Sequence, residues 1–107
     1  MLTLPIKKKW FDMIKASEKL EEYREIKPYW TKRFENNLNE VTLNMNYRYP
    51  IIESAKGTVI FKNGYQKNAP KIRCKINLKI NIGKIEWGAE PNKEYYVLKI
   101  LSVEEVK

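Results

Sequence analysis

Residues 17–24 contain the first side chains that could act on a ligand. Lys19, Glu22 and Arg24 bring an amine, a carboxylate and a guanidinium close together in the chain. Such groups bind phosphate and base edges, and a lysine whose pKa is lowered by burial can serve as a base beside a carboxylate. Residues 19–25 suit a helix or a strand by propensity alone. As a strand they place Glu22 and Arg24 on one face, with Lys19 just before it, which forms a compact Lys/Glu/Arg cluster.

A second candidate is the polar side of residues 71–82. Apolar residues occupy every even position, and the odd positions carry two asparagines and four cations, Lys71, Arg73, Lys75 and Lys79. This period of two predicts a long strand with one buried face and one basic face. Cations repeated along a strand face lie about 6.6–6.8 Å apart and could follow a phosphate backbone. The alternative is a solvated face whose lysines maintain solubility and prevent edge pairing.

The net charge is compatible with a polyanionic partner. The 107 residues include 21 Lys and Arg against 13 Asp and Glu, a formal charge of +8. Residues 51–85 hold eight of the basic side chains and a single acid, Glu53, so the sequence predicts one positive face. Aromatic residues make up 12% of the chain, and base stacking requires such surfaces.

The residue types that are scarce exclude several kinds of chemistry. The chain has no histidine, which excludes a Ser-His-Asp or Cys-His catalytic pair and argues against a zinc site. Its single cysteine, Cys74, excludes an intrachain disulfide, and no apolar run is long enough for a transmembrane helix. We therefore expect a cytoplasmic protein with no metal, no cofactor and no membrane partner.

The elements that must position these residues predict an α+β fold. Apolar spacing predicts helices over residues 7–17 and 28–37, and strands over residues 2–6, 41–45, 57–61, 71–82 and 95–103. This order suits a mostly antiparallel β-barrel of about five or six strands, flanked by the two helices. Trp10, Trp30 and Phe34 fall at helical core spacing. Packing explains two other aromatic residues less well, and we expect these to contact a ligand: Tyr65, in a loop over residues 63–70, and Trp87.

Residues 17–24 also resemble the signature of the ASCH domains (activating signal cointegrator homology), a branch of the PUA-like superfamily. The family pattern G-x-K-x-x-E-x-R is matched by Lys19, Glu22 and Arg24, with Ser17 in place of the glycine. Residues 61–70 are similar to a second motif, F-x-N-G-Y-x-x-x-A-P, in a phage and bacterial subgroup of the family. The resemblance covers nearly the whole chain and implies one domain over residues 1–107.

The resemblance implies a small PUA-like β-barrel whose cleft is lined by Lys19, Glu22 and Arg24. It also implies RNA or a modified nucleotide as the partner. Asn63 and Tyr65 of the second motif would join this site, with Tyr65 stacking on a base. The basic strand would attract phosphate without regard to sequence, through Lys71, Arg73, Lys75 and Lys79.

Some members of the family are enzymes. One bacterial branch removes the acetyl group of N4-acetylcytidine with a motif lysine, a threonine three residues later and a distant glutamate. Glu22 occupies the threonine position here, so that nucleophile is missing. We therefore expect a binding module rather than an enzyme. The alternatives are a small hydrolase acting on modified nucleosides or RNA, with Lys19 and Glu22 as catalytic residues, and a protein-interaction domain.

Overall fold

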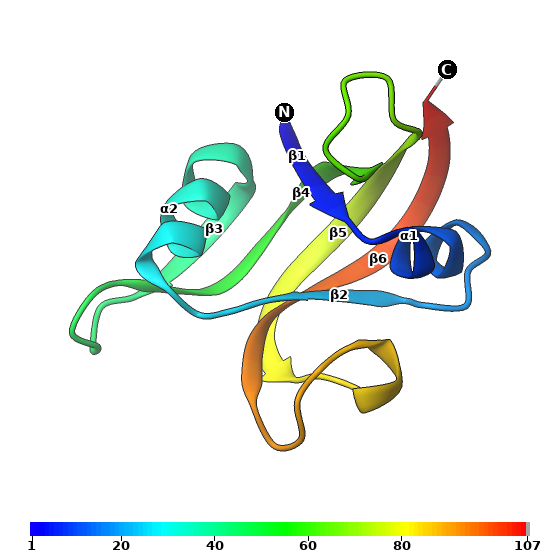
Figure 1. The fold of residues 1–107 in the computed structure, drawn as a ribbon. Helices are drawn as coiled ribbons and strands as arrows, with labels where there is room; N and C mark the ends of the chain where they lie inside the picture. Colours follow the sequence, from blue (N-terminus) through cyan, green and yellow to red (C-terminus); the bar gives the residue numbers. More distant parts are fainter. Residues whose placement is uncertain (107) are drawn as a thin grey trace.

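One curled sheet of six strands organises the chain in a computed structural model, which describes residues 1–106 (Figure 1). In chain order the elements are β1 (Leu2–Ile6), α1 (Lys8–Lys15), β2 (Glu21–Arg24), α2 (Pro28–Asn37), β3 (Asn39–Asn44), β4 (Ile51–Asn63), β5 (Lys71–Ile82), the 3₁₀ helix η1 (Ile85–Trp87) and β6 (Glu94–Val106). The strand order is β1-β4-β5-β6-β2, and β3 pairs with the first half of β4. Over the described residues, β1 and β4 pair in parallel and every other strand pair is antiparallel. The predicted α+β architecture is confirmed.

The inner face of the curled sheet carries the apolar core. The even-numbered side chains of β5 from Ile72 to Leu78 are buried there, beside Phe61 of β4 and Tyr96 of β6. Phe34 of α2 closes one end of this core, where its ring meets that of Tyr96 edge to face at 5.7 Å. Burial of each large apolar side chain contributes about 1.5–3 kcal/mol. The odd-numbered side chains of β5 consequently point outward, as the alternation predicts.

The end of α1 turns the chain sharply toward β2. Ser17 has a left-handed backbone with φ of 59°, the N–H of Glu18 donates to the carbonyl oxygen of Met13 at 2.8 Å, and the N–H of Ser17 donates to Ile14 at 3.0 Å. These two bonds form a Schellman motif, which satisfies the last carbonyl groups of the helix. The turn places Lys19 just before β2, so the segment that suits a helix or a strand by propensity forms a strand over Glu21–Arg24.

The sheet does not close into a full barrel. Its two end strands, β1 and β2, pair with β4 and β6 respectively and leave an open seam between them. Figure 1 shows α1 and α2 on either side of β1. The seam is spanned by a side chain, because Nη2 of Arg24 on β2 lies 3.5 Å from the carbonyl oxygen of Pro5 on β1. Within residues 1–106, no helix is long and apolar enough to cross a membrane.

Candidate functional site

A cleft of about 870 Å³ occupies the open seam between β1 and β2. The end of β1, the start of α1, β2, the first half of α2, the loop after β4 and η1 all contribute to its wall. Among the described residues its lining includes seven large aromatic side chains, four cations and one acid, namely Trp10, Tyr23, Tyr29, Trp30, Tyr65, Trp87 and Tyr95, then Lys7, Lys8, Arg24 and Arg33, and finally Glu22. The cleft therefore combines apolar ring faces with an excess of positive charge.

Lys19 lies behind this wall and is only 1% exposed. Its Nζ donates to the carbonyl oxygen of Trp87 at 2.6 Å and lies 3.2 Å from Oε1 of Glu22. The rings of Trp10 and Tyr23 cover the same ammonium group at 4.8 and 4.9 Å from their centroids. Burial lowers the pKa of Lys19, and the neighbouring Glu22 opposes that shift. The amine is thus enclosed by protein groups instead of facing the cleft.

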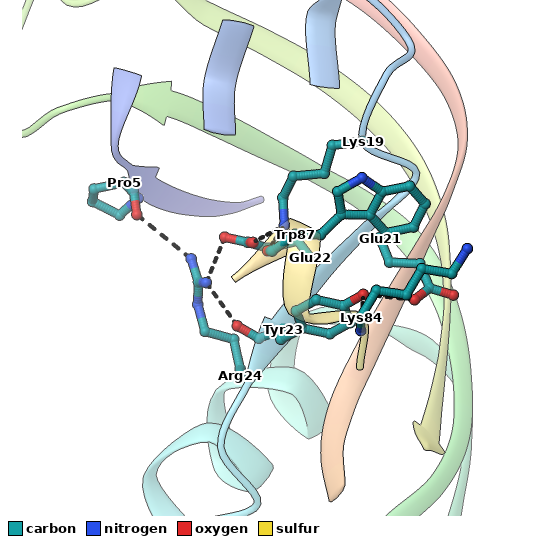
Figure 2. Close-up of polar contacts among 8 residues, drawn as sticks. All are labelled: Pro5, Lys19, Glu21, Glu22, Tyr23, Arg24, Lys84 and Trp87. Carbon is teal, nitrogen blue, oxygen red and sulfur yellow. Dashed lines mark hydrogen bonds and ion pairs between the residues drawn. The ribbon is translucent and has the colours of Figure 1, made fainter. Parts of the chain in front are cut away.

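Glu22 divides its carboxylate between two cations (Figure 2). Oε1 faces Lys19, and Oε2 accepts a hydrogen bond from Nη1 of Arg24 at 2.6 Å. The alternation of β2 brings Glu22 and Arg24 to the same inner face, while the Schellman turn delivers Lys19 beside them. The cluster carries one net positive charge, and Glu22, the one acid of the lining among residues 1–106, is already paired with both cations.

Arg24 is the member of the cluster that reaches the cleft. Its side chain is 14% exposed, and its Nη1 also donates to the carbonyl oxygen of Tyr23 at 3.0 Å. The guanidinium carbon lies 5.2 Å from the ring centroid of Trp30, within the range of a cation–π contact. A planar guanidinium held in this way can bind phosphate or a base edge with two parallel bonds.

Tyr23, which is buried beside Ala89 and Tyr95, secures η1. Its hydroxyl accepts a hydrogen bond from the N–H of Lys84 at 3.0 Å and donates to Oε1 of Glu21 at 2.8 Å (Figure 2). Burial raises the pKa of Tyr23, so the hydroxyl stays protonated. Lys19 and Tyr23 therefore hold the segment of Trp87 from two sides, and Trp87 is fixed as a wall of the cleft.

Asn63 and Tyr65 both line the cleft, so the motif of residues 61–70 lies at the same site as Glu22 and Arg24. The N–H of Asn63 donates to Pro70 at 2.9 Å and closes the loop, which was predicted over residues 63–70. The N–H of Gly64 donates to Ile6 at 3.1 Å and ties this loop to the end of β1. Tyr65 remains 88% exposed, so its ring is available to a ligand.

The four cations of β5 do not join the cleft. Lys71, Arg73, Lys75 and Lys79 lie on the outer face of the sheet, hereafter the basic outer face. Because β5 is central in the strand order, this face is turned away from the seam between the end strands. Arg73 pairs with Glu104 of β6 at 3.3 Å, whereas the three lysines make no ion pair with any residue of the described chain.

Several residues of the cleft are not foreseen from the sequence. Trp10 and Trp30 pack against the core as predicted, but both are only half-buried and also line the cleft. Phe34, the third member of that prediction, is fully buried. Tyr29 and Arg33 share the cleft side of α2 with Trp30, a grouping visible in the sequence as i, i+1, i+4 spacing.

Comparisons with family models, curated proteins and solved structures found no match to this chain. The similarity to ASCH domains therefore rests on the motif residues themselves. In the part of the chain that the structure describes, no group of three His, Cys, Asp or Glu residues could hold a metal ion. Cys74 is buried in the core, and burial raises the pKa of its thiol to about 12, which keeps it protonated and unreactive.

Proposed function

We propose that this chain is an ASCH-type binding module that holds RNA or a modified nucleotide in the cleft. The observation that carries the proposal is an aromatic-walled cleft whose single acid is already paired with two cations. Ring faces stack on bases, and lysine and arginine bind phosphate, so this lining suits an anionic aromatic ligand.

Lys19, Glu22 and Arg24 have different roles in binding. Arg24 contacts the phosphate or a base edge, and Glu22 fixes the orientation of its guanidinium through the 2.6 Å bond. Lys19 is a positioning residue, because its amine is enclosed by Glu22 and the Trp87 carbonyl. Tyr65 offers a ring face, and Asn63 offers an amide, to the base.

The backbone at Ser17 supports the ASCH resemblance on physical grounds. The family pattern has glycine at this position, and glycine adopts a left-handed conformation without the steric cost that a Cβ brings. Ser17 has φ of 59° at this same position, inside the turn that delivers Lys19. The basic outer face would add a sequence-independent attraction for a polyanion, while the cleft would recognise the specific nucleotide.

The proposal is tested by titrating the protein with nucleoside monophosphates and with short single-stranded RNA at low salt. Removal of the exposed ring in Tyr65→Ala should weaken binding about tenfold, since stacking on one base contributes about 1–3 kcal/mol. Tyr47→Ala, at a ring that is 59% exposed and does not line the cleft, is the matched control and should change nothing. The proposal is wrong if neither kind of ligand binds.

A hydrolase acting on modified nucleosides or RNA is the second candidate. The observation in its favour is the lowered pKa of Lys19, because burial favours the neutral amine that a general base requires. Incubation with N4-acetylcytidine and with RNA, followed by Lys19→Ala and Glu22→Gln, separates the two functions. Turnover that the folded Lys19 and Glu22 variants both lose, and that Tyr47→Ala retains, supports the hydrolase. Binding without turnover supports the module.

A further inference from the structure

A second hollow of about 580 Å³ lies beside the cleft. Three residues line both spaces, namely Thr3 of β1 and Tyr29 and Arg33 of α2. The remaining wall of the second hollow comes from the start of the chain and the far end of α2, with Met1, Leu2, Lys32, Asn36 and Asn37. The two spaces therefore lie next to each other along α2.

The junction between the two hollows is built from stacked planar groups. The rings of Tyr29 and Trp30 meet edge to face with centroids 5.0 Å apart. The guanidinium of Arg33 lies 5.5 Å from the Tyr29 ring and 5.7 Å from the Trp30 ring, and its Nη1 donates to the Tyr29 hydroxyl at 3.1 Å. Tyr29 nevertheless remains 60% exposed, so a preorganised ring faces solvent at this point.

The second hollow has the charge and polarity of a nucleic-acid contact. Lys32 and Arg33 are its cations, and no acid belongs to its lining among the described residues. The amide nitrogen of Asn37 donates to the carbonyl oxygen of Arg33 at 2.7 Å, which leaves the amide oxygen as an acceptor. Asn36 presents a second exposed amide. Phosphate can meet the cations here while base edges meet the amides.

We propose that the cleft and the second hollow form one groove for a single-stranded nucleic acid longer than one nucleotide. Tyr29 and Arg33 would stack at the junction, and Lys32 and Asn36 would contact the next nucleotide along α2. The ten residues of α2 span about 15 Å, which exceeds the size of one base. This inference rests on the proposed function of the cleft, and it adds the length and the strandedness of the ligand.

The experiment compares the affinities of the four nucleoside monophosphates with those of single-stranded RNA homopolymers of up to about six nucleotides. For the wild type, affinity should rise over the first few nucleotides and then level off. Lys32→Glu should remove most of that rise. Lys75→Glu, an equal change of charge on the basic outer face, should preserve it. Tyr29→Ala should lower oligomer affinity about tenfold, and Tyr29→Phe should retain it.

The outcomes separate the two proposals. If monophosphates bind but longer RNA binds no more tightly, the groove is wrong and the cleft proposal stands. Equal losses from Lys32→Glu and Lys75→Glu would also overturn the groove, because general charge would then explain the rise. Double-stranded RNA that binds as tightly as single-stranded RNA overturns the strandedness. If no nucleotide or oligomer binds, both proposals are wrong.

Discussion

The buried amine of Lys19 donates to the carbonyl oxygen of Trp87 at 2.6 Å, although the two residues are 68 positions apart. Lys19, which lies next to β2, thereby holds η1 in place as part of the cleft wall. The same amine balances Glu22, which orients Arg24. Lys19 and Glu22 therefore act as structural residues, and the Arg24 guanidinium is the group of the cluster that faces the cleft.

Loss of the Lys19 charge should destabilise the fold. Lys19→Met leaves Glu22 with one unpaired oxygen in a buried site, and removal of one partner from a buried ion pair costs about 3–5 kcal/mol. Urea denaturation measures this as a fall in the midpoint. The double variant Lys19→Met, Glu22→Gln removes both charges and should recover at least half of the loss.

The control for this comparison is Lys8→Met, at a side chain that is 76% exposed and forms an ion pair with nearby Asp12. Its unfolding midpoint should stay close to that of the wild type. A similar loss in Lys8→Met, or no recovery in the double variant, would contradict the role of the buried pair.

Ser17→Gly should stabilise the protein. The left-handed backbone at Ser17 costs about 1–2 kcal/mol for a residue with a Cβ, and the added flexibility of glycine in the unfolded chain offsets about 0.5–1 kcal/mol of the gain. We expect a net increase of about 0.5–1 kcal/mol in the free energy of unfolding. Ser17→Ala retains a Cβ and should give no increase, so equal behaviour of the two variants would refute the explanation.

The sequence was most informative where one segment contains its own pattern. The alternation in residues 71–82 predicts the bounds of β5, and Pro28 and Asn37 mark both ends of α2. The strand predicted over residues 57–61 is the second half of β4, which begins at Ile51. Adjacent Ile51 and Ile52 are both buried, and β3 pairs there with shifts of register, so the period of two is lost.

The composition of the cleft depends on pairing that no local pattern encodes. The parallel pairing of β1 with β4 brings the ends of both strands together, and with them Lys7 and Tyr65. Trp30 has the helical spacing of a core residue and packs against the core, but within α2 only Thr31 and Phe34 are buried. Spacing identifies one face of a helix, whereas the strand order decides what covers that face.

Tyr96→Phe should loosen the attachment of α2 to the sheet. The buried Tyr96 hydroxyl forms a 2.5 Å hydrogen bond with Oγ1 of Thr31 and accepts from the N–H of Ile52 at 3.1 Å. Removal of the hydroxyl leaves both groups buried without this partner, at a cost of about 1–3 kcal/mol. Thermal or urea unfolding measures the loss. In a double-mutant cycle with Thr31→Val, additive effects would show that the two residues are not coupled.

Stability should fall at alkaline pH because of Cys74. Burial raises its pKa from 9.0 to about 12, so above about pH 9 the unfolded chain releases the thiol proton while the folded chain keeps it. The folded state then binds more protons, and stability decreases with rising pH by about 1.4 kcal/mol per unit from this group. Cys74→Ala should show a shallower decline between pH 9 and pH 11 in urea denaturation. An identical slope would contradict the assignment.

Association with RNA should depend more on Lys7 than on Lys75. Both are exposed lysines with no ion pair among residues 1–106, but Lys7 lines the cleft and Lys75 belongs to the basic outer face. Salt screens charges over about 8 Å at physiological ionic strength, so a lysine on the far side of the sheet attracts a ligand at the cleft only weakly. In stopped-flow measurements Lys7→Gln should lower the association rate more than Lys75→Gln, although each variant removes one charge. Equal reductions would contradict the prediction, because general charge rather than the position of the cleft would then govern the association rate.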